Sequence, residues 1–242
     1  MEAIRTVSLT KKYKDVTAVD HLELTVEQGQ LLSLLGVNGA GKTTTVKLLS
    51  CLTAPTEGDA FLNGKSVVRD TAAVKSMIAV CPQETAVAPG LTVRENLALM
   101  CGIYGFGKDI RSEKIEELTS LFGLGSVLSK KAGKLSGGWQ RRLSIAMALI
   151  GEPQILFLDE PTLGLDVLAR SDLWELIRSL KGKITVVLTT HYLEEAEALS
   201  DRVAILKDGR LQICGTVGEI REKAGTDSFA QAFIHFAKGA AT

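Results

Sequence analysis

The chain lacks an excess of charge of either sign. Its 242 residues contain 28 Lys and Arg against 28 Asp and Glu, so the formal net charge is zero. Proteins that hold nucleic acid by neutralising its phosphates usually carry a basic excess. The charge balance therefore disfavours a nucleic-acid-binding protein.

Paired cysteines and long apolar runs are also missing. The chain has no Cys-x-x-Cys pair, and no histidine stands near any of its four cysteines, Cys51, Cys81, Cys101 and Cys214. This spacing disfavours a metal site or a disulfide framework and favours buried, reduced thiols in a cytosolic protein. The first residues lack the apolar core of a signal peptide, and no apolar run reaches the ~18 residues that span a bilayer. We therefore expect a cytosolic chain that reaches a membrane only through a partner.

What the chain does contain is an alternation of strand and helix patterns. Apolar runs predict strands at 4–9, 22–26, 30–35, 59–62, 78–81, 155–158, 184–189, 203–206 and 211–214. Helical spacing predicts helices at 42–51, 168–180 and 193–199. Such alternation predicts a largely parallel sheet covered by helices, and the closely spaced early strands predict an added antiparallel layer.

The middle of the chain is different, because residues 92–149 have apolar residues at helical spacing almost throughout. This pattern predicts a helical insertion in an α/β core. The last stretch, 226–242, predicts a short amphipathic helix with a frayed end. The expected organisation is a core of 1–83 and 150–225, an insertion at about 84–149 and a tail of 226–242.

A glycine-rich loop follows the strand expected at 30–35. Its residues match Gly-x-x-x-x-Gly-Lys-[Ser/Thr], between a strand and a helix. The glycines let backbone N–H groups approach phosphate oxygens, and the helix start adds its positive end. Lys42 would reach the β- and γ-phosphates, and the Thr43 hydroxyl would bind Mg²⁺. The predicted phosphate contacts are Gly36, Asn38, Gly39, Ala40, Gly41, Lys42, Thr43 and Thr44.

The segment "ILFLDEP" supplies two carboxylates. Its four apolar residues predict a buried strand, and ligands of open α/β sheets bind beyond the carboxyl ends of the strands. Asp159 would hold Mg²⁺ and Glu160 would be the general base for an attacking water. A glutamate after a strand is often only solvated, but the phosphate loop on the same chain favours the catalytic role.

Further motifs make the chain recognisable. "LSGGWQRR" lies between the two motifs above, and "PTLGLD" and "TTHYLEEAEALSDRVAIL" follow them. Together with "YKDVTAV" and "CPQE", these resemble the nucleotide-binding subunit of an ATP-binding-cassette (ABC) transporter, over about residues 4–219. Several stretches are most similar to bacterial exporter subunits that pair with a separate permease chain.

The resemblance implies a fold and an activity. The fold would be a P-loop NTPase core with a RecA-like, mostly parallel sheet, an antiparallel β layer, and a helical subdomain inserted between Gln83 and the "LSGG" signature. The activity would be ATP hydrolysis with Mg²⁺, which drives a membrane permease, for export, at the cytoplasmic face of the membrane. The transported substrate stays open.

The resemblance also implies roles for individual residues. Tyr13 would stack on adenine, and Gln83 would touch Mg²⁺ or the attacking water and relay the nucleotide state to the permease. Asp166 would lie in the loop that joins two active sites. His191 would contact the γ-phosphate. Each of these residue types also occurs in such places for structural reasons, as a strand-edge tyrosine or a solvent-facing histidine does.

The signature implies a dimer. Ser136 is a good N-cap, and Gly137 and Gly138 leave the N–H groups of the first helical turn bare, so this helix start is a second anion site. In the resembling family it closes over the γ-phosphate bound to a second subunit, either identical or homologous. Trp139 departs from the family's glutamine, and Gln140 cannot replace it because one residue turns a side chain ~100° around a helix.

Three other functions remain as alternatives. A soluble ABC-type ATPase acting on ribosomes or nucleic acid usually has two cassettes or a coiled-coil arm, neither of which this sequence contains. A nucleotide-binding regulator without turnover would not need Glu160 and His191. A phosphate-loop kinase has no use for the "LSGG" signature.

Overall fold

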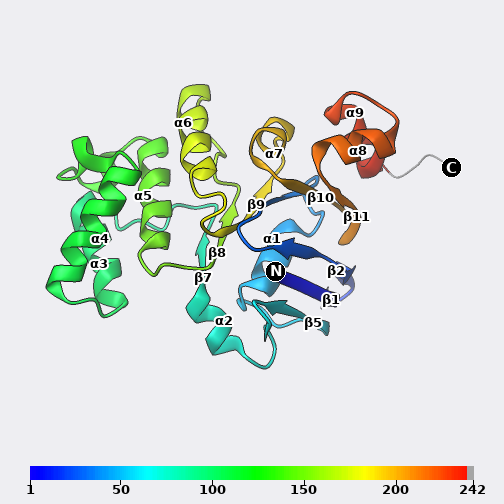
Figure 1. The fold of residues 1–242 in the computed structure, drawn as a ribbon, viewed down its shortest axis with the longest axis horizontal. Helices are drawn as coiled ribbons and strands as arrows, with labels where there is room; N and C mark the ends of the chain where they lie inside the picture. The colour runs from blue at the N-terminus through cyan, green and yellow to red at the C-terminus, as the bar shows by residue number, and fades with distance from the viewer. Residues whose placement is uncertain (239–242) are drawn as a thin grey trace.

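The computed structural model describes residues 1–238, and its centre is a six-stranded sheet (Figure 1). In spatial order the strands are β11 (Arg210–Gly215), β10 (Arg202–Lys207), β4 (Leu31–Leu35), β9 (Thr185–Thr190), β8 (Ile155–Asp159) and β7 (Ile78–Cys81). All neighbours are parallel except β11, which pairs antiparallel with β10. The predicted, largely parallel sheet is confirmed.

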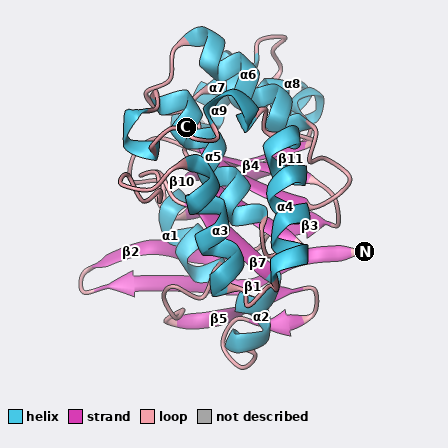
Figure 2. Ribbon diagram, turned by 90° about the vertical axis from the view of Figure 1, so that its left-hand side faces the viewer, coloured by secondary structure: helices cyan, strands magenta, loops and turns pink. Residues whose placement is uncertain are grey.

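A second, antiparallel sheet is built from the early strands, as the sequence predicts. Its order is β2 (Val16–Leu22), β1 (Glu2–Tyr13), β5 (Glu57–Leu62) and β6 (Lys65–Ser66), with β3 (Thr25–Glu27) also paired to β1. In Figure 2 its long strands cross the lower part of the molecule, and helices α6 to α9 gather at the upper end.

The strand expected at 22–26 is wrong, because the chain leaves β2 at Leu22 and starts β3 at Thr25. The Thr6 hydroxyl lies at this break, where it donates to the Leu22 carbonyl at 2.6 Å and accepts the Leu24 N–H at 2.7 Å. These side-chain hydrogen bonds add to a backbone hydrogen bond from the Thr6 N–H to the Leu24 carbonyl at 2.9 Å, so Thr6 holds both sides of the break. The position before Leu22, His21, has a φ of 47°, a conformation outside the β region.

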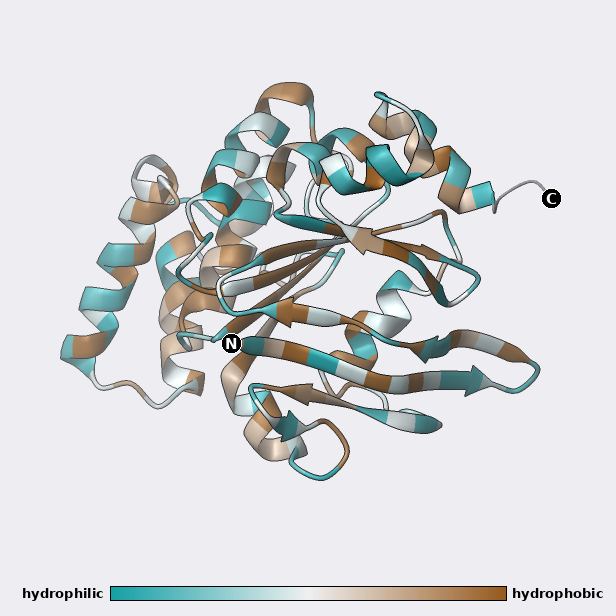
Figure 3. Ribbon diagram, turned by 45° about the vertical axis from the view of Figure 1, so that its right-hand side comes forward, coloured by the Kyte–Doolittle hydropathy of each residue, from teal (hydrophilic) through white to brown (hydrophobic). Residues whose placement is uncertain are grey.

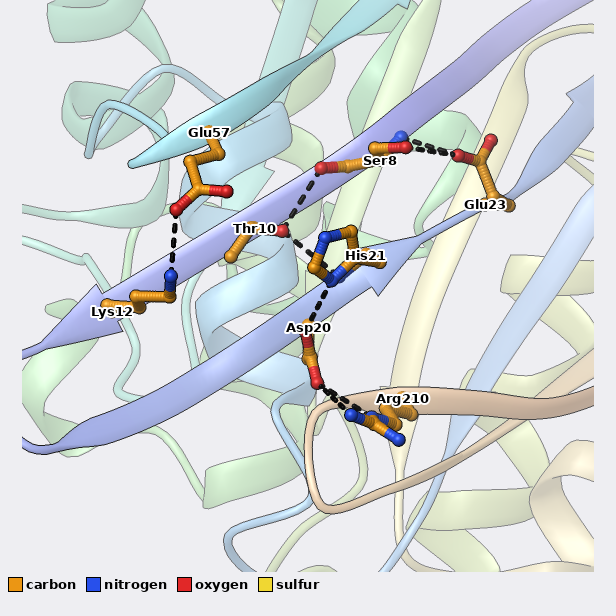
Figure 4. A network of polar contacts seen from close by, with 8 residues as sticks. All are labelled: Ser8, Thr10, Lys12, Asp20, His21, Glu23, Glu57 and Arg210. Carbon is orange, nitrogen blue, oxygen red and sulfur yellow. Dashed lines mark hydrogen bonds and ion pairs between the residues drawn. The ribbon is translucent and has the colours of Figure 1, made fainter.

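Polar contacts tie the β1–β2 hairpin to both sheets (Figure 4). The Lys12 ammonium lies 2.7 Å from the Glu57 carboxylate across β1 and β5. The Asp20 carboxylate lies 2.6 Å from the Arg210 guanidinium, which links β2 to β11. Hydrogen bonds from His21 and then from Arg210 hold the pKa of Asp20 below its usual value. The β1–β2 hairpin is therefore fixed to β5 of its own sheet and to the edge strand β11 of the main sheet.

The helices fall into two groups. Those beside the sheets are α1 (Lys42–Leu49), α2 (Thr71–Met77), α6 (Val167–Arg178), α7 (Leu193–Leu199), α8 (Val217–Ala224) and α9 (Phe229–Lys238). The others form a separate group at one end of the molecule (Figure 1): α3 (Val93–Ile103), α4 (Lys108–Leu121) and α5 (Gly137–Leu149), with short 3-10 turns at Leu124–Val127 and Ala132–Lys134. The predicted helical stretch at 92–149 is confirmed, whereas α2 and α8 were not expected. Helix α1 ends before the expected residue 51, since Cys51 has a φ of 55°.

The core follows the central strands, which are largely brown in Figure 3. Every residue of β4, β8 and β9 is buried, as expected for strands covered on both faces. Helix α9 joins this core, because Phe229 and Ala232 are buried in one cluster with Leu35 and Ile205. The frayed end predicted for the tail lies outside the described residues. No helix within residues 1–238 is both long and apolar enough to cross a bilayer.

Candidate active site

Four parallel strands end at the same edge of the main sheet. Their register pairs Leu35 with Thr190, Thr189 with Asp159, and Leu158 with Cys81. The segments that follow these strands carry the phosphate loop, Glu160, His191 and Gln83. Motifs far apart in the sequence therefore meet at the edge where α/β sheets bind their ligands.

The phosphate loop needs its glycines for packing and for backbone conformation. Gly41 has a φ of 101°, and a Cβ there would lie 2.5 Å from the Ala18 carbonyl oxygen. A Cβ on Gly36 would lie 2.6 Å from the Leu206 carbonyl oxygen. Since neither backbone can shift without disturbing a strand, larger residues are excluded at both positions.

A cavity of about 330 Å³ opens over this loop. Its walls are Ala18, Asn38, Gly39, Ala40, Gly41, Lys42, Thr43, Thr44, Gln83 and Glu160. A larger cavity, of about 580 Å³, is lined by residues such as Gly29, Gln154 and Thr185 at the opposite ends of the strands, and no motif residue reaches it. The smaller cavity is the candidate active site because the motifs converge there.

Lys42 places a buried ammonium group beneath the loop. Its Nζ donates to the Gly36 carbonyl at 2.7 Å and lies 3.8 Å from a carboxylate oxygen of Glu160. Burial lowers the pKa of Lys42, and the charges of Glu160 and Asp159 offset only part of that effect. An ammonium so poorly solvated gains from a phosphate oxyanion as an additional partner.

Asp159 sits between two hydroxyl groups. Its Oδ1 accepts from the Thr189 hydroxyl and, at 3.4 Å, from the Thr43 hydroxyl. Gln83, the third predicted metal ligand, lines the adjoining cavity. Carboxylate, hydroxyl and amide oxygens are the hard ligands that Mg²⁺ prefers, so the donor set fits this cation.

Glu160 is fixed by both its backbone and its side chain. Its N–H donates to the Thr189 carbonyl at 3.1 Å and to the Thr189 hydroxyl at 3.0 Å, and its φ is 48°. The carboxylate oxygen Oε2 lies 2.8 Å from Nδ1 of His191. Only 8% of Glu160 is exposed, whereas the His191 side chain is 37% exposed. The carboxylate is therefore held at the cavity by a ring that still faces outward.

Tyr13 and Asp166 are not among the residues that line the cavity. Tyr13 ends β1 and is 44% exposed, with the Lys11 ammonium 5.0 Å from its ring centroid. Asp166 caps α6, because its Oδ1 accepts the Ala169 N–H at 2.9 Å. Both side chains remain accessible to a ligand or a partner from outside.

The signature residues also lie away from the cavity. Ser136 is the N-cap of α5 as predicted, but its hydroxyl makes none of the hydrogen bonds that a capping side chain usually makes. A Cβ on Gly138 would lie 3.1 Å from that of Ala169, which favours glycine there. Ser136 and Gly137 are exposed, and no residue of α5 appears among the cavity walls.

The residues after the signature turn toward their own chain. The Trp139 ring is half-buried, with the Arg142 guanidinium 4.9 Å from its centroid. The Gln140 amide donates to the carbonyls of Ala132 at 3.1 Å and Leu135 at 3.3 Å. The Gln140 amide is therefore engaged by carbonyls of its own chain.

Sequence reasoning missed a further buried carboxyl group near the site, besides Asp159 and Glu160. Glu195 of α7 is fully buried and accepts a hydrogen bond from the Trp174 indole at 3.1 Å. Burial raises the pKa of Glu195, and the Glu160 charge adds to this effect. It also missed Arg141, a buried arginine in the helical segment. For Glu195 and for Arg141, the only signal in the sequence was a charged residue at a helical position that faces the interior.

The fold and this site define a phosphate-loop nucleotide-binding protein. The profile described as "ABC transporter" matches residues 19–163. The "Daunorubicin/doxorubicin resistance ATP-binding protein DrrA" of Streptomyces peucetius is 41% identical over 93% of this chain and 68% of its own length. The "Phospholipid-transporting ATPase ABCA3" of Homo sapiens is 39% identical over 88% of this chain, which spans only 12% of that relative.

Solved structures agree with this assignment. "Structure of ATP binding subunit of ABC transporter" has a TM-score of 0.85 at 29% identity, and the match covers 97% of this chain and 99% of the other. A dimeric ATP-binding cassette, MJ0796 in a post-hydrolysis state with ADP and Pi, has a TM-score of 0.78 at 27% identity over 88% of this chain and 98% of that one. The chain therefore belongs to the ABC transporter family, as a domain that binds and hydrolyses ATP.

Proposed function

We propose that this chain is the ATP-hydrolysing subunit of an exporter whose permease is a separate chain. One observation carries the proposal: the phosphate-loop cavity and the exposed signature helix start are separate surfaces of the same molecule. Each is half of a phosphate site, so two copies, or this chain and a homologue, would complete two sites head to tail. The drug-resistance name of the Streptomyces relative favours export of a drug-like substrate.

In this proposal the cavity residues divide the work of hydrolysis. Backbone N–H groups of the loop and Lys42 bind the phosphates of ATP. Glu160 takes a proton from the water that attacks the γ-phosphorus, and His191 holds that carboxylate in place while it contacts the γ-phosphate. Tyr13 stacks on adenine from its exposed position. Mg²⁺, held by Thr43, Asp159 and Gln83, would neutralise charge on the phosphate oxygens.

The remaining proposed roles belong to the assembly. Ser136, Gly137 and Gly138 of one copy contact the γ-phosphate bound by the other, and Asp166 lies at the junction of the two sites. The chain divides into a core of 1–83 and 150–225, a helical insertion at about 84–149 and a tail from 226. The stretch from Gln83 to about Leu97 meets the permease, which keeps the subunit peripheral, at the cytoplasmic face of the membrane.

The test is a pull-down from membranes of the native organism with tagged Glu160→Gln chain and ATP, followed by mass spectrometry. A multi-span protein recovered in stoichiometric amount would support the proposal. Recovery of ribosomes, or of the tagged chain alone, would contradict the transport role while leaving ATP hydrolysis intact. A tagged Lys42→Ala chain is the control for ATP-independent binding.

A further inference from the structure

The segment that carries Gln83 is held by side chains of α5. Arg141 is 4% exposed, and its guanidinium donates to the Pro82 carbonyl at 2.7 Å and to the Gln83 carbonyl. The preceding residue of α5 is Gln140, and its amide oxygen accepts a hydrogen bond from the Thr85 hydroxyl at 3.4 Å. Two consecutive residues of one helix thus contact both sides of Gln83.

The same helix begins at the exposed signature. The Gln140 N–H donates to the Ser136 carbonyl at 3.0 Å, so both lie within the first turns of α5. The Gln140 amide also holds the carbonyls of Ala132 and Leu135, just before the helix. Because a helix moves as a rigid body over such a short length, a displacement of its start carries the segment at Gln83 with it.

The bonding of the Arg141 guanidinium fits a role in positioning the Gln83 segment better than a role in stabilising the core. Within residues 1–238 the Arg141 guanidinium forms no ion pair, and backbone carbonyls are its oxygen partners. Burying a cation without a carboxylate is costly, so a neutral residue would serve better as core filler. The rigid donor fork of arginine, however, fixes two consecutive carbonyls in one geometry.

We propose that Arg141 is a positioning residue that couples contact of ATP with the signature end of α5 to the placement of Gln83 in the cavity of the same chain. The inference rests on the proposed function, because the ATP that reaches α5 is bound by the other copy. Each copy then responds, through Arg141, to the ATP of its partner. The two sites are therefore coupled in both directions.

The test compares Arg141→Met with Arg111→Met in the full chain. Arg111 is the matched control: a half-buried arginine of α4 whose guanidinium bonds the Phe106 carbonyl at 3.5 Å, without contact to the Gln83 segment. Arg141→Met is expected to lower kcat about 10–100-fold, as misplacement of a catalytic group by ~1 Å does. It should also reduce the Hill coefficient for ATP to about one. The Kd for ATP without Mg²⁺ should stay within about twofold of the wild-type value. Arg111→Met should match wild type in kcat, in the Hill coefficient and in this Kd.

Two further variants make the outcome specific. Arg141→Lys keeps the charge but lacks the planar donor fork that fixes two carbonyls in one geometry, so it should recover only part of kcat. In a Gln83→Ala background, Arg141→Met should have no further effect, since Arg141 acts through Gln83. Two results would overturn the coupling and leave the proposed function intact. One is wild-type cooperativity for ATP in a folded Arg141→Met chain, and the other is an undiminished effect of Arg141→Met in the Gln83→Ala background. ATP hydrolysis that is insensitive to Glu160→Gln would overturn the proposed function and the coupling with it.

Discussion

Replacing Glu160 by glutamine tests the centre of the candidate site. The substitution keeps the size of the side chain, so the backbone bonds to Thr189 and the φ of 48° are retained. The amide cannot take a proton from water. Loss of a general base costs about 10²–10⁴-fold in rate, which corresponds to about 2.7–5.5 kcal/mol in the barrier.

The same change alters the charge beneath the phosphates. The carboxylate of Glu160 lies 3.8 Å from the Lys42 ammonium, and at an effective dielectric constant of about 20 such a pair attracts by about 4 kcal/mol. This attraction competes with phosphate for the ammonium. Its removal should tighten ATP binding even as turnover stops, so the variant should accumulate as an ATP-bound dimer.

Two measurements check the prediction. Phosphate release gives the turnover rate, and size-exclusion chromatography with ATP gives the oligomeric state. Glu197→Gln, which neutralises an exposed glutamate of α7, should behave as wild type in both. A Glu160→Gln rate within about threefold of wild type would refute the assignment of the base.

Three further predictions concern other residues. Lys42→Ala should weaken ATP binding about 10–100-fold through loss of a charge-assisted contact. Calorimetry measures the Kd for ATP, and Lys47→Ala, on the exposed face of α1, is the control. Thr43→Val should raise the Mg²⁺ concentration for half-maximal hydrolysis at least ~10-fold, and an unchanged value would exclude the hydroxyl as a ligand. The pKa of Glu195 is raised from 4.5, so the fold favours its protonated form. The free energy of unfolding of the wild type, relative to that of Glu195→Gln, should therefore fall as the pH rises from 4.5 toward the raised pKa. Urea unfolding from about pH 5 to 8 would show this slope, and parallel curves would contradict it.

Strands of the main sheet could be predicted closely because they are apolar runs that pack into the core. Strand β7 and helix α7 have the predicted bounds, and β8 and β9 differ from the predicted ranges by a single residue at their ends. Their apolar runs end where polar motif residues begin. At the break between β2 and β3 the decisive contacts come from Thr6, which lies far away in the sequence. No local pattern contains that information.

The candidate site shows the same division. Asp159 and the phosphate loop could be brought together from sequence, since ligands of open α/β sheets bind beyond the carboxyl ends of the strands. Gln83 was expected there only from the resemblance. The contacts of Arg141 with the carbonyls of Pro82 and Gln83 could not be predicted, because they depend on how the helical segment packs against β7. Glu195 was equally hidden, for its burial depends on Trp174 of a different helix.

The position of Trp139 has a practical consequence. This ring lies in the first turn of α5 with the Arg142 guanidinium over it, next to the surface that a second copy would meet. The sequence contains only one other tryptophan, Trp174, which is hydrogen-bonded to Glu195. In a Trp174→Phe chain the tryptophan fluorescence would therefore come from the signature helix alone. The departure from the family's glutamine thus supplies a native optical reporter for the proposed ATP-driven closure, with no attached dye.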